Sequence, residues 1–197
     1  MPPIFFFFLP PRETRFHIIK QGPCKATTHD IYYDRDGLLF SKGVYVRRRD
    51  GRWEAKIRAG GDYINSAFME IDGIQAVERA VKNIMVLPGF RSDLEEMLVP
   101  CADFVTDRES WMIDGKFKVD VDSTDFGHIV GEVELTRILE HGMGRQDEEA
   151  REMLAILKET MNQDIEAFML CYPQIFPVGR AVGKLSAYFH RFGGQKD

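Results

Sequence analysis

The sequence predicts an α+β fold in which strand hairpins are combined with amphipathic helices. Residues 44–58 and 117–134 alternate apolar and charged side chains with a period of two, as expected for strands with one apolar and one charged face. Residues 73–85 and 147–170 repeat apolar side chains at helical spacing, and residues 92–98 combine an N-cap serine with an acidic first turn. Such a mixture of hairpins and helices is typical of α+β proteins.

The second hairpin, residues 116–135, reads KFKVDVDSTDFGHIVGEVEL and carries four carboxylates on its charged face. Like charges that face one another across a hairpin repel unless water or cations separate them. The face is therefore either solvated, as in most one-sided hairpins, or built to hold hard cations such as Mg2+ or Mn2+. The four carboxylates belong to Asp120, Asp122, Glu132 and Glu134.

The first hairpin turns at Asp50-Gly51, a dipeptide that favours tight two-residue turns. Its charged side chains share faces by alternation, and apolar residues back them. Taken alone, this pattern is typical of a solvated surface hairpin or a nuclear-localisation patch. The side chains that share a face are Tyr45, Arg47 and Arg49 on the first strand, and Glu54, Lys56 and Arg58 on the second.

Length and charge bound the class of protein. The chain has 197 residues, of which 44% are hydrophobic, so we expect one domain over residues 1–197 with a sizeable core. A net charge of −5 argues against a non-specific nucleic-acid coat, although local basic clusters can still bind a small anion. Cys24, Cys101 and Cys171 lack metal-ligand spacing, and we expect them to be reduced, partly buried thiols of an intracellular protein.

The N-terminus is unusual, because six apolar residues at 4–9 lie between proline pairs. That run is too short to span a bilayer, which needs about 20 residues. It also lacks the basic flank and cleavage site of a signal peptide. We therefore expect a cytoplasmic monomer that has no nucleic-acid or membrane partner. The pyrimidine-rich codons of Phe and Pro suggest that residues 1–11 translate intron sequence, which transcript sequencing would test.

Five segments follow one another along the chain: VRRRDGRWEAK (46–56), FME (68–70), TDRESW (106–111), VDVDSTDFGHIVGEVE (119–134) and GKLSAYFHRF (183–192). In this order they resemble the CYTH superfamily of triphosphate tunnel metalloenzymes, and most closely the thiamine triphosphatases. The resemblance implies an antiparallel eight-stranded tunnel with helices packed outside it. The family's first strand carries Glu-x-Glu-x-Lys, which is absent before His29, so residues 1–27 are atypical and the tunnel is expected to lack that strand.

The resemblance implies Mg2+-dependent hydrolysis of the terminal phosphate of thiamine triphosphate, with Mn2+ as a possible substitute. Two alternatives within the family stay open: an inorganic or other organic triphosphatase, and a catalytically impaired relative that binds triphosphate. An unrelated small β-barrel with a solvated charged hairpin is the third alternative. Implied substrate-binding residues are Tyr45, Arg47, Arg49, Lys56, Arg108 and Lys184; implied metal ligands are Glu70, Asp120, Asp122, Glu132 and Glu134; catalytic roles are implied for Lys56, Glu132 and Glu134.

Overall fold

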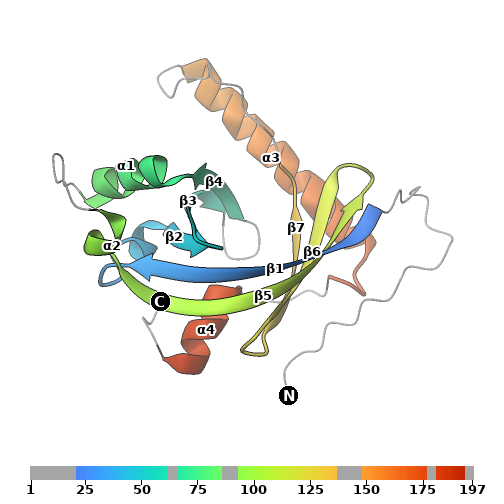
Figure 1. Cartoon of the computed structure of the whole chain (residues 1–197). Helices are drawn as coiled ribbons and strands as arrows, with labels where there is room; N and C mark the ends of the chain where they lie inside the picture. Colours follow the sequence, from blue (N-terminus) through green and yellow to red (C-terminus); the bar gives the residue numbers. More distant parts are fainter. Residues whose placement is uncertain (1–20, 62–65, 86–92, 137–147, 177–180, 194–197) are drawn as a thin grey trace. The chain divides into compact units, whose positions relative to one another are not determined.

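A computed structural model of the chain describes residues 21–61, 66–85, 93–136, 148–176 and 181–193. Strands come in runs along these ranges, and each run is followed by helices, as expected for an α+β protein (Figure 1). In chain order the elements are β1 (Gln21–Asp34), the 3-10 turn η1 (Phe40–Lys42), β2 (Val44–Arg49), β3 (Arg52–Gly61), β4 (Ser66–Asp72), α1 (Ile74–Met85), α2 (Leu94–Met97), β5 (Val99–Ile113), β6 (Phe117–Thr124), β7 (Ile129–Glu134), α3 (Glu148–Cys171) and α4 (Lys184–Phe192).

The described strands form one seven-stranded antiparallel sheet in the order β4-β3-β2-β1-β5-β6-β7. The predicted α+β class is therefore confirmed. The predicted eight-stranded tunnel is not confirmed, because the described residues supply seven strands and β4 and β7 form the two edges of their sheet. The expected absence of an opening strand concerns residues before His29, of which residues 1–20 lie outside the described ranges.

Two Asp-Gly turns set the hairpin registers. Asp50 has φ 47° and Gly51 has φ 82°, the pair of left-handed residues that a two-residue turn between twisted strands requires. This confirms the predicted β2–β3 turn. Asp114 (φ 55°) and Gly115 (φ 60°) turn β5 into β6 in the same way. Sequence reasoning did not place that hairpin, although its Asp-Gly dipeptide is the same signal.

The chain divides into two compact units. The α3 unit comprises the described residues within Met1–Lys25, Glu109–Val121 and Gly131–Arg180. The β2–β3 unit comprises those within Ala26–Arg108, Asp122–Val130 and Ala181–Asp197. The single domain expected over residues 1–197 stays a prediction.

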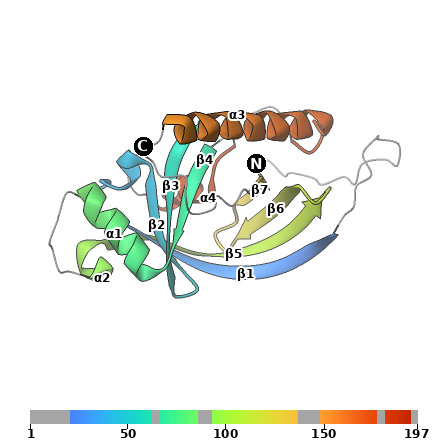
Figure 2. The ribbon, with the colours of Figure 1, turned by 90° about the horizontal axis from the view of Figure 1, so that it is seen from above.

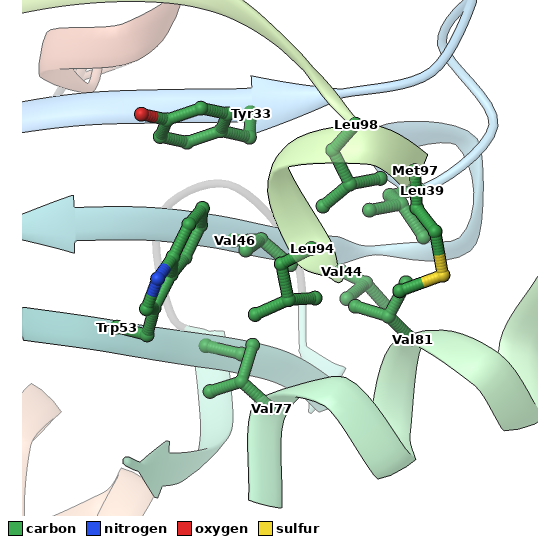
Figure 3. Packing of buried hydrophobic residues seen from close by; sticks show 11 residues of the cluster. Tyr33, Leu39, Val44, Val46, Trp53, Val77, Val81, Leu94, Met97 and Leu98 are labelled. Atoms are coloured by element: carbon green, nitrogen blue, oxygen red, sulfur yellow. The ribbon is translucent and has the colours of Figure 1, made fainter. Parts of the chain in front are cut away.

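The core of the β2–β3 unit lies between the apolar strand faces and helices α1 and α2, which neighbour each other in both ribbon views (Figure 2). The rings of Tyr33 and Trp53 meet with centroids 4.7 Å apart. Burying each valine, leucine or methionine side chain of this core stabilises the fold by about 1.5–3 kcal/mol. The residues that contact one another in Figure 3 include Val44 and Val46 of β2, Val77 and Val81 of α1, and Leu94 and Met97 of α2.

A second cluster of this unit packs α4 against β5. Tyr188 lies with its ring centroid 5.6 Å from that of Phe104 and 5.5 Å from that of Phe126. Phe104 is only 1% exposed, so the contact is dry. These aromatic contacts fix the start of α4, where Lys184 is the first helical residue.

The α3 unit has its own core, in which Phe117 of β6 stacks on Phe168 of α3 with centroids 4.3 Å apart. Phe168 belongs to the apolar stripe predicted for residues 147–170, and α3 confirms a long helix there. The stripe is not buried throughout, because Met153 in the first half of the helix is 59% exposed. Local periodicity predicted the helix, but burial also needs a partner surface, and Met153 has little of one among the described residues.

Two further expectations need correction. The helix predicted to begin after Ser92 begins at Leu94 with Asp93 as its N-cap, and Ser92 lies outside the described residues. Cys24 and Cys171 are exposed, whereas all three thiols were expected to be partly buried; only Cys101 is. Burial raises the pKa of the Cys101 thiol to about 12. None of the described helices is both long and apolar enough to cross a membrane.

Candidate functional site

Arg49 of β2 holds a buried carboxylate in the β2–β3 unit. Alternation directs Arg47 and Arg49 to the face opposite Val44 and Val46, and the strand register places Asp30 of β1 directly across from Arg49. Arg49 Nε and Nη2 each donate to one Asp30 oxygen over 2.7 Å. Asp30 is 0% exposed, so the pair is held away from water on the carboxylate side.

Arg47 lies beside this pair and is held by three neighbours. Its Nε and Nη2 donate to Glu54 Oε2 over 2.9 and 2.7 Å. Its Nη1 donates to the Tyr32 hydroxyl over 3.4 Å, and its Nε lies 3.8 Å from Asp30. Burial alone would lower the pKa of Arg47, but Tyr32, Asp30 and Glu54 together raise it. Arg47 therefore stays charged although its side chain is only 10% exposed.

Asp122 of β6 forms a second buried pair in the same unit. Arg108 of β5 donates to both of its oxygens over 2.6 Å, from Nε and Nη2. Lys184 Nζ, at the start of α4, donates to Oδ2 of the same carboxylate. Burial alone would raise the pKa of Asp122, but these two cations lower it. Asp122 is thus ionised and orients both cations.

The two pairs lie close enough to interact electrostatically. Burial alone would raise the pKa of Asp30, but Arg49 and Arg47 lower it. The charge of Lys184 adds to this lowering, although Lys184 hydrogen-bonds Asp122. Lys56 of β3 binds Glu70 of β4 over 2.6 Å. Burial alone would raise the pKa of Glu70, but Lys56 lowers it, and the charges of Arg47 and Arg49 add to the lowering. All the predicted phosphate-binding cations therefore gather in one unit. We call this set the basic cluster: Arg47, Arg49, Lys56, Arg108 and Lys184.

Three carboxylates come together in the α3 unit. One ligand atom each from Asp120, Glu132 and Glu134 lies within 4.8 Å of the others. Lys118 Nζ donates to Asp120 over 2.6 Å and to Glu134 over 3.1 Å. Burial would lower the pKa of Lys118, but these two acids raise it. An all-oxygen donor set that already attracts a cation fits Mg2+ or Mn2+, which prefer carboxylate ligands.

The five acids predicted to bind metal are thus divided. Asp120, Glu132 and Glu134 come together, and we call them the acid cluster. Glu70 and Asp122 instead pair with cations of the β2–β3 unit. Asp120 and Asp122 are both 0% exposed, so their strand face is not a simply solvated one.

Tyr45, the residue predicted to contact an organic group on the phosphates, lies among other rings. It is paired across the strands with Lys56. Its ring centroid lies 5.6 Å from that of Phe40, in a stacked arrangement, and 6.0 Å from that of Phe68, edge-on. The aromatic surface therefore adjoins one cation of the basic cluster.

Sequence reasoning missed Asp30 and Lys118 as partners within the two clusters. For Lys118 the signal was present, because it alternates in phase with Asp120 on one strand face. For Asp30 no local signal exists, since its partner Arg49 is 19 positions away and the pairing depends on the register of β1. Glu54 was placed on the charged face of β3, but not as the partner of Arg47.

Comparison with known proteins finds no matching family model. The chain is 28% identical over 128 residues to the thiamine-triphosphatase of Homo sapiens and to that of Macaca fascicularis. Each alignment covers 56% of this chain, and the chain spans only 56% of the length of these curated relatives.

Solved structures are more distant. A candidate adenylyl cyclase from Hippeastrum with a dominant triphosphatase activity has a TM-score of 0.46 at 13% identity, covering 85% of this chain and 83% of its own. A candidate adenylate cyclase from Bacillus halodurans has a TM-score of 0.40 at 11% identity, covering 86% and 83%. The resemblance predicted from the motifs is confirmed by the two thiamine-triphosphatases.

Proposed function

We propose that this CYTH-like chain binds a triphosphate and hydrolyses its terminal phosphate, with thiamine triphosphate as substrate and thiamine diphosphate and phosphate as products. The names of its two curated relatives support this reaction. Because the chain spans 56% of their length, the activity is a proposal for this chain and not a property carried over.

The observation that carries the proposal is the basic cluster. Two fully buried carboxylates, Asp30 and Asp122, hold guanidinium groups through paired hydrogen bonds, so the cations are fixed before any ligand arrives. A guanidinium has five N–H donors, and Asp30 accepts from only two nitrogens of Arg49. The remaining N–H groups of Arg49 can donate to phosphate oxygens, whose spacing matches the planar guanidinium group.

The acid cluster is proposed to hold Mg2+, with Mn2+ as a substitute. When bound, the ion would neutralise charge that develops on the phosphate oxygens during transfer. Glu132 and Glu134 would act in catalysis by holding it, and Lys56 by contacting phosphate. Glu70 and Asp122, named as metal ligands from the sequence, would act by orienting Lys56, Arg108 and Lys184, as their ion pairs support.

Tyr45 is proposed to lie against the organic group. It is two residues from Arg47 on the same strand face, so its ring adjoins the phosphate-binding cations. A cationic thiazolium on this ring would gain about 0.5–2 kcal/mol. Tyr45→Ala should therefore weaken thiamine triphosphate more than inorganic triphosphate, which has no ring. Equal losses for the two ligands would reject the stacking role.

The test of the function is phosphate release from the purified chain with Mg2+, using thiamine triphosphate, inorganic triphosphate and ATP. We expect phosphate release from thiamine triphosphate. Release only from inorganic triphosphate or ATP would instead indicate that the chain is an inorganic or other organic triphosphatase. Binding of triphosphate without release would identify a catalytically impaired relative, for which the absent Glu-x-Glu-x-Lys pattern is the sequence argument. Failure to bind any triphosphate would refute the proposal.

A further inference from the structure

Arg58 is a cation of β3 that no motif accounts for. It lies two residues beyond Lys56, and therefore on the same face of the strand. The β3–β4 register pairs Lys56 with Glu70 and Arg58 with Phe68. The side chains on this face of β3 thus continue from Lys56 of the basic cluster to a further cation, Arg58, whose cross-strand neighbour is Phe68.

The guanidinium of Arg58 is positioned by two aromatic residues. Its Nη2 donates to the Tyr45 hydroxyl over 3.3 Å, and its Cζ lies 5.3 Å from the centroid of the Phe68 ring. Its backbone N–H donates to the Gly43 carbonyl over 2.8 Å. A Cβ on Gly43, which has φ 68°, would lie only 2.9 Å from Arg58 Cβ, so the arginine stem packs where a glycine leaves room.

The rings around Tyr45 form an electron-rich surface that attracts cations. Phe40 stacks on Tyr45, and Phe189 of α4 lies 5.9 Å from Phe40. Arg58 already places a positive charge against this surface, at the Tyr45 hydroxyl and over Phe68. A second cation that approached Tyr45 would be repelled by the first, whereas a neutral or absent organic group would not.

We propose that Arg58 determines substrate preference: it weakens binding of a triphosphate whose organic group is cationic, relative to one whose group is neutral or absent. The proposal rests on the proposed function, since it assumes that phosphates bind at the basic cluster with the organic group beside Tyr45. If so, thiamine triphosphate binds more weakly than it would to the aromatic surface without Arg58. The affinity for inorganic triphosphate, which has no organic group, is not reduced in this way.

The test compares dissociation constants for thiamine triphosphate and inorganic triphosphate, measured by calorimetry on the full chain. The ratio of the two constants cancels the attraction that Arg58 exerts on phosphate in general. In Arg58→Gln the ratio of thiamine to inorganic triphosphate is expected to fall roughly 3- to 10-fold, because one repulsive charge at close range is removed. Arg58→Lys keeps the charge and should keep the ratio of the unmodified chain.

Arg79→Gln is the matched control, since it removes the same charge from an exposed position on α1, where Arg79 Nε donates to the Gln75 carbonyl. An unchanged or higher ratio in Arg58→Gln, or an equal fall in Arg79→Gln, would overturn the inference while leaving the function intact. Loss of all triphosphate binding in the unmodified chain would overturn both. If Arg58→Gln does not fold, Arg58→Met is used in its place, because the methionine side chain keeps the packing of the arginine stem without its charge.

Discussion

Arg49 and Asp30 form a two-point ion pair in which both hydrogen bonds are 2.7 Å long and the carboxylate has no exposure to solvent. Loss of Arg49 would leave the buried charge of Asp30 without this partner, which is costly, and loss of Asp30 would remove the anion that orients Arg49. The pair therefore links the stability of the β2–β3 unit to the geometry of the proposed phosphate site.

Asp30→Asn should lower the free energy of unfolding by about 3–5 kcal/mol, since it leaves Arg49 without its anion. Urea denaturation followed by circular dichroism measures the change. Asp103→Asn is the control, because Asp103 pairs with His29 at an exposed position and should cost about 1 kcal/mol or less. Similar losses in both variants would contradict the importance assigned to the buried pair.

The free energy of unfolding should decrease as the pH is lowered into the acid range. Burial raises the pKa values of Asp30 and Asp122, but their cationic partners outweigh it and hold both below the ordinary 3.8. Because the folded values are depressed, this stability is present above about pH 4 and lost as the pH falls through the lowered values. Denaturation curves between about pH 7 and pH 2 should show this loss, and Asp122→Asn should show a smaller one. An equally steep acid loss in Asp122→Asn would count against its ionised state.

Phosphate release should stop when a chelator is added and resume with Mg2+ or Mn2+. Glu134→Gln removes a charged ligand from the acid cluster, and it should raise the Mg2+ concentration for half-maximal release roughly 10-fold or more. Glu109→Gln, which breaks a surface pair with Lys25 in the same unit, should leave that concentration unchanged. Release that persists in chelator would rule out the metal role.

Lys56→Ala should weaken triphosphate binding about 10-fold or more, because a charge-assisted contact contributes about 1.5–3 kcal/mol. Lys56 is 30% exposed, so the variant should fold. Lys116→Ala is the control, since Lys116 is 38% exposed and is paired with Asp164 in the α3 unit. Calorimetry with inorganic triphosphate measures both. Equal affinity in the two variants would show that Lys56 does not contact phosphate.

Leu94→Ala should lower the free energy of unfolding by about 2–5 kcal/mol, because Leu94 is 1% exposed among the side chains of Figure 3 and its loss leaves a cavity. Ile74→Ala on the neighbouring helix should change it little, since Ile74 is 52% exposed. Thermal unfolding of the two variants provides the comparison, and a larger loss in Ile74→Ala would show that the core is misplaced.

Local patterns predicted the two hairpins and the long helices because each depends on residues that are neighbours in sequence. Alternation at Arg47 and Arg49, and the Asp50-Gly51 turn, were enough to place side chains on faces. The length of β1 could not be predicted, because residues 21–28 contain Gly-Pro and few strand formers.

The partner of each carboxylate was harder to predict. Asp120 and Asp122 have the same chemistry and lie two residues apart, yet one joins the acid cluster and the other binds Arg108 and Lys184. That difference is set by strands and a helix that are distant in sequence. The sequence therefore indicates which residues are charged and which face they share, but not which charges meet.

The two-residue turn at Asp50-Gly51 has a consequence for how this gene can change. Because only two residues join β2 and β3, the turn fixes their register. One extra codon in either strand would therefore move every side chain beyond the insertion, counted from the turn, to the other face of the sheet. An extra codon directly before Trp53, for example, would put Trp53 in the place of Glu54 opposite Arg47, so that a core ring would face the charged side. In-frame insertions or deletions of a single codon within residues 44–58 should therefore be removed by selection, while many substitutions at the exposed end of the turn should persist.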